Sequence, residues 1–337
     1  MTEFNFFKVL EKDNKELVHS AFIAYLIDSD KQFAKEFLNI SDKDLELSRL
    51  ETSYIENNRN KLKKLRIRID IEVRSRDGAT VTFIENKFKS FPTKRQLDDY
   101  NRVFKSHFDK VIKINKILFC FDKRIVNFPT DWQIYDYADI LSYLKKNYHL
   151  DGQDDKSIFI RHYFRFLEDY FTRYSKLDQT CHQLFHLGVT IEEKFWIRLL
   201  NSKIAMQFEQ EFCDREFYMV INPGNTAVPL LNIIPLDWKT KMGEETLIQF
   251  QGNDLKFYLH SDNKKAAEKI ILHAGPKRWN ERLELKTISK RQEKSCYIFK
   301  MKVVENLRKE FTYTELYEII KEFYIQTNKL IVESYVL

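Results

Sequence analysis

The chain has few of the residues that mark disordered, disulfide-bonded or membrane-spanning proteins. Only 7 of its 337 residues are glycine and 6 are proline, which argues against collagen-like segments, disorder and long linkers. Its 4 cysteines are widely scattered and fit free thiols in a reducing compartment. No apolar run approaches the roughly 20 residues that a helix needs to cross a bilayer, and the first residues lack the features of a secretion signal. We therefore expect a cytoplasmic protein that does not enter membranes.

The absence of two motifs argues against two classes of enzyme chemistry. The sequence contains no glycine-rich phosphate-binding loop and no Gly-x-Ser-x-Gly nucleophile motif, so nucleotide-driven and serine-hydrolase chemistry have no support. What is present is an ordinary globular composition, 43% hydrophobic and 31% charged, in a chain long enough for two domains. Beyond a polar break at 151–155 and a long aromatic segment, the pattern changes. We expect one domain over 1–177 and a smaller α+β domain over 178–337, which would serve recognition, sensing or oligomerisation.

Periodicity and turn residues predict the order of the elements. In the first domain we expect helices or largely helical segments at 15–28, 31–58, 94–100, 140–146 and 157–176, and strands at 66–73, 80–87, 116–121 and 132–137. In the second we expect helices at 191–211, 264–274 and 312–324, and strands within 217–234, 246–260 and 296–303. Both domains therefore mix helices and strands.

The most informative segment is a predicted hairpin. Two runs rich in β-branched residues, 66–73 and 80–87, flank the pair Asp77-Gly78, and an Asp-Gly pair in this setting predicts a type I′ turn. Counting outward from a two-residue loop places Asp70 opposite Glu85 on one face, with Cβ atoms roughly 5 Å apart. Two facing carboxylates repel each other, whereas a divalent cation bound between them removes the penalty.

Alternation along the two strands assigns their faces. Lys87 shares the face of Asp70 and Glu85, and the opposite face carries Ile67, Ile69, Ile71, Val73, Thr82, Ile84 and Phe88. Two carboxylates and a lysine suit phosphodiester hydrolysis, because Mg²⁺ prefers oxygen ligands, activates water and stabilises charge developing on phosphate. The Asn86 carbonyl could supply a third oxygen, and Lys87 could orient the water. The alternative is a surface network in which Lys87 and Arg68 neutralise the acids.

Motifs on either side of the hairpin extend this pattern. Asp70 followed by Glu85-Asn86-Lys87 resembles the Asp…Glu-X-Lys signature of the PD-(D/E)XK nuclease superfamily. More closely, the segments 16–20 and 96–100 resemble those of a bacterial branch with an N-terminal Glu…Ser helix, an Ile-Glu-Asn-Lys core and a Gln-Leu…Tyr helix. The resemblance covers roughly residues 5–177 and does not extend to the C-terminal domain.

The resemblance implies a fold, a metal ion and roles for particular residues. The fold would be an α/β (α+β) restriction-endonuclease-like core, in which helices flank a mixed sheet. Asp70 and Glu85 would hold Mg²⁺, for which Mn²⁺ would substitute, and Lys87 would be the catalytic lysine. Glu16 would be an additional acid near or on the metal, although it could equally be an exposed residue near a helix start. Ile69 stands where the motif has its variable proline. The residues that would border the site are Ser20, Gln96 and Tyr100.

We therefore expect a Mg²⁺-dependent nuclease that acts on DNA rather than RNA, as an endonuclease in bacterial defence. Its partners would be nucleic acid and either a second copy or a defence-system protein. One alternative is a non-catalytic nucleic-acid- or protein-binding module on the same fold. Another is a nuclease that stays silent until its C-terminal domain binds a ligand or partner. The run from Arg59 to Arg68, with six basic and no acidic residues, is either a solvated stretch or a phosphate-binding flank.

Overall fold

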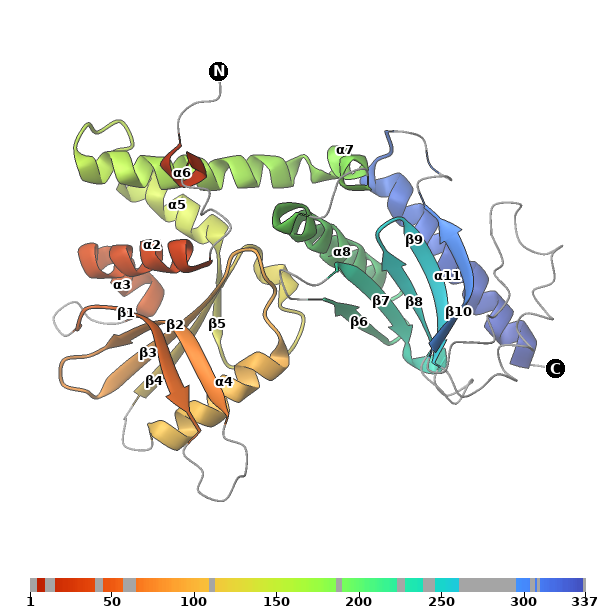
Figure 1. Cartoon of the computed structure of the whole chain (residues 1–337), viewed down its shortest axis with the longest axis horizontal. Helices are drawn as coiled ribbons and strands as arrows, with labels where there is room; N and C mark the ends of the chain where they lie inside the picture. The colour runs from red at the N-terminus through yellow and green to blue at the C-terminus, as the bar shows by residue number, and fades with distance from the viewer. Residues whose placement is uncertain are drawn as a thin grey trace. The chain divides into compact units, whose positions relative to one another are not determined.

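The chain forms two compact units, Met1–Tyr174 and Ser175–Leu337 (Figure 1). The computed structural model describes residues 5–9, 16–39, 45–56, 65–108, 113–185, 190–222, 228–238, 246–260, 295–303, 307 and 310–335. The helix predicted at 264–274 and most of the basic run, residues 59–64, lie outside the described residues. In the part of the chain that is described, no helix is long and apolar enough to cross a membrane.

A five-stranded mixed sheet forms the centre of the first unit, in the order β1-β2-β3-β4-β5. Its strands are β1 (Arg49–Ile55), β2 (Arg66–Arg74), β3 (Thr80–Lys87), β4 (Lys113–Cys120) and β5 (Gln133–Asp136). The first three strands are antiparallel neighbours, whereas β4 and β5 run parallel to β3. The parallel pair β3–β4 requires a crossover, which α4 (Lys94–His107) supplies. The mixed sheet expected from the resemblance is confirmed.

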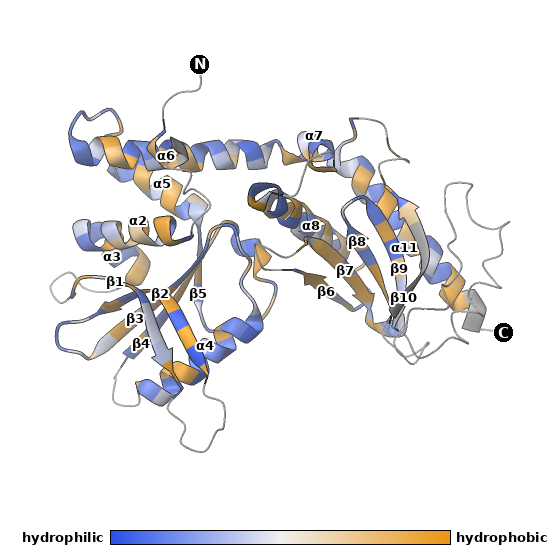
Figure 2. Ribbon diagram, viewed as in Figure 1, coloured by the Kyte–Doolittle hydropathy of each residue, from blue (hydrophilic) through white to orange (hydrophobic). Residues whose placement is uncertain are grey.

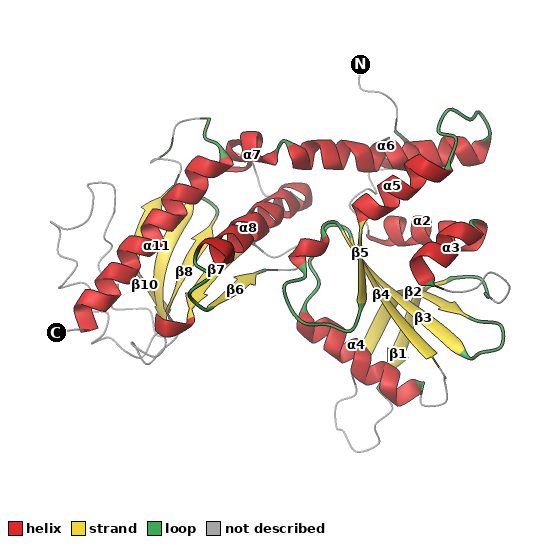
Figure 3. Cartoon of the chain, turned by 180° about the vertical axis from the view of Figure 1, so that it is seen from behind, coloured by secondary structure: helices red, strands yellow, loops and turns green. Residues whose placement is uncertain are grey.

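Helices cover both sides of this sheet (Figures 1 and 3). On one side lies α4, which is largely hydrophilic in Figure 2 and buries one stripe made of Leu97, Tyr100, Val103 and Phe104. The other side carries α2 (Glu16–Ser29), α3 (Lys31–Leu38), α5 (Tyr137–Asn147) and α6 (Asp155–Ser175). Short helical turns at Phe6–Val9 (α1) and Lys123–Ile125 (η1) complete the unit. The sheet is therefore enclosed, and its central strands are buried on both faces.

The largely helical segment expected over 31–58 is wrong at residues 49–55. Helix α3 ends at Leu38, and the next residue, Asn39, has a left-handed backbone with a φ of 52°. Residues 49–55 form strand β1 instead. This strand lies at the edge of the sheet with most of its side chains exposed. Its sequence therefore lacks the alternation of apolar and polar residues by which strands are recognised.

The turn between β2 and β3 is longer than the predicted type I′ turn. Ser75 N donates to Thr80 O at 2.9 Å, which leaves the four residues 76–79 as the loop. Within this loop, all of which the structure describes, only Gly78 has a positive φ, 69°, whereas a type I′ turn needs two such residues. A four-residue loop with the same centre keeps the predicted register, which is confirmed at the four pairs of residues 71–74.

The apolar face predicted for the hairpin is divided between the two sides of the sheet. Ile71 pairs with Ile84, but Ile67 and Ile69 belong to the core cluster beneath α4. That cluster also contains Val81, Phe83, Leu97, Tyr100, Val103 and Phe104. In a regular strand Ile69 and Ile71 would share one face, so β2 is irregular at Asp70. The face prediction is wrong for the first half of β2, because a change of side within a strand leaves no mark in its sequence.

Glu72, the second acid of β2, is a buried carboxylate that pairs with a half-buried arginine. Its side chain is fully buried, accepts a hydrogen bond from the Tyr54 hydroxyl and pairs with Arg74 Nε at 2.5 Å. Loss of one partner from a fully buried ion pair costs about 3–5 kcal/mol, and because the Arg74 side chain is 34% exposed, the expected cost here is about 1–3 kcal/mol. We expect Arg74→Met to lower the free energy of unfolding in urea by about this amount. The control, Arg49→Met, removes an exposed pair and should change it by about 0.5 kcal/mol or less. Equal losses in the two variants would show that the Glu72 pair contributes no more than a surface contact.

A five-stranded antiparallel sheet forms the second unit, in the order β10-β9-β8-β7-β6. Its strands are β6 (Phe217–Ile221), β7 (Leu230–Pro235), β8 (Thr246–Gln251), β9 (Asp254–His260) and β10 (Ser295–Lys302). Its described helices include α7 (Leu177–Thr180), η2 (Cys181–Phe185), α8 (Ile191–Glu211) and α11 (Tyr313–Tyr335). Aromatic contacts join α8 to α11, including that of Phe208 with Tyr324. The unit therefore combines helices and strands, in the class the sequence predicts.

Candidate active site

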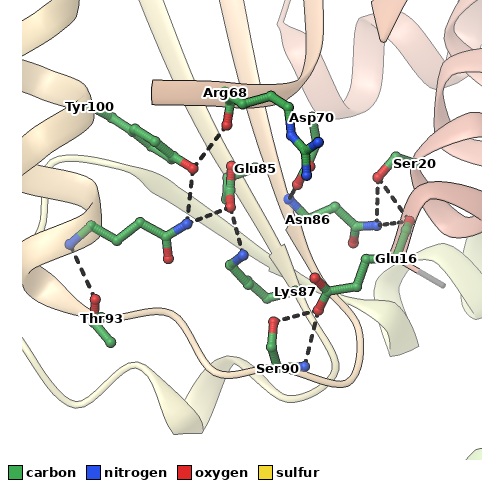
Figure 4. Close-up of polar contacts among 11 residues, drawn as sticks. Glu16, Ser20, Arg68, Asp70, Glu85, Asn86, Lys87, Ser90, Thr93 and Tyr100 are labelled. Atoms are coloured by element: carbon green, nitrogen blue, oxygen red, sulfur yellow. Dashed lines mark hydrogen bonds and ion pairs between the residues drawn. The ribbon is translucent and has the colours of Figure 1, made fainter. Parts of the chain in front are cut away.

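A pocket of about 460 Å³ opens over the first half of β2 and the C-terminal end of β3. Its lining includes six of the residues singled out from the sequence: Glu16, Asp70, Glu85, Lys87, Gln96 and Tyr100. Figure 4 shows the side chains of Glu16, Asp70, Glu85, Lys87 and Tyr100 converging from α2, two strands and α4. Asn86 and Ser20 meet behind the same strand and do not line the pocket.

Asp70 lies where the pairing of β2 with β3 stops. The paired stretch ends at Ile71 and Ile84. Beyond it, the Asp70 carboxylate accepts the hydrogen bond of the Asn86 main-chain N–H at 2.7 Å, in the place that a main-chain carbonyl would fill in a regular ladder. Asp70 and Glu85 therefore do not form the regular cross-strand pair that the sequence predicts. The irregularity of β2 instead turns the Asp70 side chain toward the main chain of β3.

Glu85 contributes a carboxylate of which only half is satisfied by the protein. Its Oε1 pairs with Lys87 Nζ at 2.7 Å and accepts a hydrogen bond from Gln96 Nε2 at 2.8 Å (Figure 4). Its Oε2 is buried and has no hydrogen-bond partner in the described structure. Buried carboxylate oxygens are seldom left without a partner. The free oxygen therefore fits a cation ligand, and the observed donor set of carboxylates suits a hard divalent ion.

The charged groups of the pocket shift one another's pKa values. Burial, followed by the negative charge of Glu85, raises the pKa of Asp70 to about 7. Burial also raises the pKa of Glu85, against the opposing effect of Lys87. Burial alone would lower the pKa of Lys87, but the carboxylates of Glu85, Glu16 and Asp70 raise it well above its usual value. Lys87 is therefore an ammonium group at any physiological pH, whereas Asp70 exchanges its proton near neutrality.

The raised pKa of Asp70 predicts how stability depends on pH when no metal is bound. Its pKa is about 7 in the folded protein and about 3.9 when unfolded, so the folded state holds an extra proton between these values. The loss of stability caused by the buried, ionised Asp70 carboxylate is absent below about pH 4. It grows as the pH rises and is fully present above about pH 7. We expect Asp70→Asn to melt several degrees above the wild type at pH 8 in EDTA, with little difference at pH 4. The exposed control Asp98→Asn should change neither value. An Asp70→Asn protein that melts below the wild type at pH 8 would contradict the assignment.

Asn86 directs its main-chain groups toward Asp70 on β2 and its side chain toward α2, on the face of β3 away from the pocket. Its Nδ2 donates to Ser20 Oγ at 3.0 Å and to the Glu16 main-chain oxygen at 3.2 Å. In a strand, the N–H and C=O of one residue point to the same side, and successive residues alternate. The Lys87 carbonyl accepts from Phe121 N on the β4 side, so the Asn86 carbonyl is directed to the β2 side, toward Asp70. It is therefore placed to be the third oxygen beside the two carboxylates.

Glu16, the first residue of α2, is held by the loop that follows β3. Its Oε1 accepts hydrogen bonds from the Ser90 N–H, at 3.1 Å, and from the Ser90 hydroxyl (Figure 4). Among the described residues, no three His, Cys, Asp or Glu side chains are grouped closely enough to form a ready metal centre. The donors that fit a cation are thus two carboxylates, Asp70 and Glu85, and one main-chain oxygen. Glu16 borders this set and adds negative charge to it.

Helix α4 supports the pocket from the other side. Thr93 Oγ1 accepts from Gln96 N at 3.2 Å and caps the N-terminus of the helix. Besides its contact with Glu85, Gln96 Nε2 donates to the Tyr100 hydroxyl at 2.9 Å, and that hydroxyl donates to Arg68 O at 3.1 Å. The two side chains, four residues apart on one helical face, therefore connect α4 to both strands and orient Glu85.

Several residues of the site carried no signal in the sequence. Ser90 follows the lysine of the motif by three positions, but nothing marks it as a partner of Glu16. Arg95 lines the pocket with Arg66 and Arg68, and its position on α4 could have been found only from the fold. Arg68 Nη1 also pairs with Glu51 Oε1 at 3.1 Å in an exposed contact. The described end of the basic run thus reaches the pocket.

Comparison with protein-family models matches residues 4–165 to the PD-(D/E)XK nuclease superfamily. No curated protein and no solved structure matches the chain. The matched segment contains every residue that lines the pocket and ends within α6, before the second unit begins.

Proposed function

Residues 4–165 belong to the PD-(D/E)XK nuclease superfamily, and from this premise we propose that the chain is a Mg²⁺-dependent nuclease that hydrolyses phosphodiester bonds in DNA. Members of the superfamily are generally nucleases. The single observation that carries the proposal is the buried Glu85 Oε2, an oxygen without a protein partner. It lies in a pocket with a second carboxylate and an ammonium group.

The residues that would hold Mg²⁺ are Asp70, Glu85 and the carbonyl of Asn86. Three oxygen ligands leave room for the waters that Mg²⁺ usually retains. When bound, the ion would lower the pKa of a bound water and neutralise charge on the phosphate. Because Asp70 has a pKa of about 7, it gives up its proton to a cation at little cost near neutral pH. Metal binding should therefore weaken as pH falls below about 7.

Lys87 is proposed to act as a charge and a hydrogen-bond donor. In the metal-free site the surrounding carboxylates raise its pKa, so the amine carries a positive charge there. Its ion pair with Glu85 Oε1 holds the ammonium group in the pocket with most of its surface buried. From this position it can orient the attacking water and stabilise the charge that develops on the phosphate oxygens.

Three arginines, Arg66, Arg68 and Arg95, are exposed around the pocket that holds the acids. We propose that they contact the phosphates of the substrate on either side of the scissile bond. Such contacts position the nucleic acid without reading its sequence, and their contribution falls as salt concentration rises. Recognition of a target would then rest on other parts of the chain, including the second unit.

Cleavage of a panel of substrates tests the proposed function. We expect the purified chain to nick or linearise supercoiled plasmid with Mg²⁺ or Mn²⁺ and to leave it intact in EDTA. Cleavage of linear but not circular DNA would indicate an exonuclease, and cleavage of RNA alone would change the substrate class. No cleavage of plasmid, linear DNA, single-stranded DNA or RNA would count against an autonomous nuclease, and in favour of a binding module or a nuclease that needs an activating partner.

The proposal includes a role in bacterial defence and a partner, either a second copy or a defence-system protein. This part rests on the resemblance to the bacterial branch. We would test it by the plating efficiency of phage on cells that express the wild type or Glu85→Ala. Protection that is equal in both would separate any defence role from the nuclease site.

A further inference from the structure

Behind the pocket, a chain of buried hydrogen bonds connects three helices to the strand that carries Glu85 and Lys87. The Tyr137 hydroxyl, on α5, donates to Asn86 Oδ1 at 2.6 Å. The Tyr163 hydroxyl, on α6, is hydrogen-bonded to that of Tyr137, and His19 Nδ1, on α2, lies 2.9 Å from the Tyr163 hydroxyl. Tyr137, Tyr163 and Asn86 are completely buried, and His19 is 1% exposed.

The direction of each hydrogen bond in this chain follows from one end. The Glu16 main-chain oxygen can only accept, so the amide nitrogen of Asn86 faces it, and the amide oxygen faces Tyr137. The Tyr137 hydroxyl donates its one proton to Asn86, and it must therefore accept a hydrogen bond from Tyr163. Tyr163 must in turn accept from His19. Each of the two tyrosine hydroxyls thus donates one hydrogen bond and accepts one. Removal of the Tyr137 hydroxyl therefore takes a partner from both Asn86 and Tyr163.

Tyr137 also holds the residue on the other side of Lys87. Its ring packs edge-on against Phe88 with centroids 4.7 Å apart, and His19 stacks on Phe88 with centroids 3.9 Å apart. Asn86 and Phe88 lie on the face of β3 away from the pocket, and Lys87 lies between them on the pocket face. One side chain therefore restrains the main chain on both sides of Lys87.

Asn86 is the residue through which this restraint reaches the proposed metal site. Its N–H is bound by Asp70, its carbonyl is directed toward Asp70, and its side-chain groups are held by Tyr137, Ser20 and the Glu16 carbonyl. We infer that Tyr137 is a positioning residue that sets the Asn86 carbonyl for metal binding. Tyr137 touches neither the pocket nor any group proposed to react. This inference rests on the proposed function.

Binding of Mn²⁺ to the metal-free protein tests the inference without reliance on cleavage. Free Mn²⁺ is followed by its electron paramagnetic resonance signal during titration of the wild type, Tyr137→Phe and Tyr143→Phe. The control residue lies on the same helix, is buried and donates its hydroxyl to Asp30 at 2.8 Å, away from β3. Loss of a group that orients a metal ligand typically weakens binding by about 10- to 100-fold. We expect a Kd raised by about that factor in Tyr137→Phe and an unchanged Kd in Tyr143→Phe.

Cleavage kinetics supply a second readout. We expect Tyr137→Phe to lower kcat at a fixed Mg²⁺ concentration and to leave the KM for DNA unchanged, because Tyr137 contacts no substrate. A wild-type Kd for Mn²⁺ in folded Tyr137→Phe overturns the inference, and so does an equal loss in Tyr143→Phe. If Tyr137→Phe does not fold, Tyr163→Phe, which removes the donor to Tyr137, is judged by the same Kd comparison. If Mn²⁺ binding by the wild type does not depend on Glu85, the proposed function fails as well. If it depends on Glu85 but not on Tyr137, only the inference about Tyr137 fails.

Discussion

Replacement of Glu85 by alanine is expected to reduce Mg²⁺-dependent DNA cleavage by a factor of about 10³ or more. The substitution removes the buried pocket oxygen that has no hydrogen-bond partner among the described residues, together with the counter-charge of Lys87. A metal ion contributes several kcal/mol of transition-state stabilisation, and about 1.4 kcal/mol corresponds to a tenfold change in rate. Steady-state cleavage of plasmid DNA measures the loss.

Two further variants show whether the loss belongs to the carboxylate or to the fold. Glu85→Gln keeps the size of the side chain and can still accept from Gln96, but it removes the charge. We expect it to lose nearly as much activity as Glu85→Ala while it retains the far-ultraviolet circular dichroism of the wild type. Asp98→Ala removes an exposed acid of α4 and should cleave like the wild type. Activity in Glu85→Gln within about threefold of the wild type, a difference of less than about 0.7 kcal/mol, would show that Glu85 holds no metal.

Replacement of Lys87 by alanine is expected to reduce cleavage by a factor of about 10²–10⁴, the range for loss of a positioned group that assists proton transfer. The same change removes the charge that opposes the raised pKa of Glu85. The pKa of Glu85 should therefore rise further, so its carboxylate ionises only at higher pH. We expect Mn²⁺ binding by Lys87→Ala to weaken at pH 7 and to recover at pH 9, while cleavage stays low at both values.

This split between binding and cleavage distinguishes a catalytic lysine from a structural one. Lys87→Arg keeps the charge but not the compact ammonium group, so it should bind Mn²⁺ at pH 7 and still cleave slowly. Lys94→Ala removes an exposed lysine of α4 and serves as the matched control. If cleavage by Lys87→Ala recovers together with Mn²⁺ binding at pH 9, the role of Lys87 is limited to keeping Glu85 ionised.

The sequence was sufficient for the parts of the site that depend on local pattern. The register of β2 and β3 was predictable because a two-residue and a four-residue loop with the same centre pair the same residues. The cap at Thr93 and the spacing of Gln96 and Tyr100 were predictable because helix geometry repeats. These local features indicate that the residues of the Glu-X-Lys motif lie beside α4. The rest of the fold is not needed for this prediction.

The parts that depend on irregular or distant contacts were not predictable. No residue type marks the irregularity at Asp70, which makes its carboxylate an acceptor for the main chain of β3. Glu72 is an acid in the same strand, and only its buried contacts with Tyr54 and Arg74 show that it is structural. Tyr137 is 51 positions from Asn86, and a contact between side chains so far apart leaves no periodic pattern. Strand β1 was missed because an exposed edge strand has little alternation.

The most direct test of the central claim is one plasmid-nicking experiment with four arms, the wild type and Glu85→Ala, each with Mg²⁺ and with EDTA. The site described above predicts that only the wild type with Mg²⁺ converts supercoiled DNA to nicked or linear forms. Equal conversion by the wild type and Glu85→Ala in Mg²⁺ would contradict it, since cleavage would then not depend on the carboxylate at the centre of the pocket.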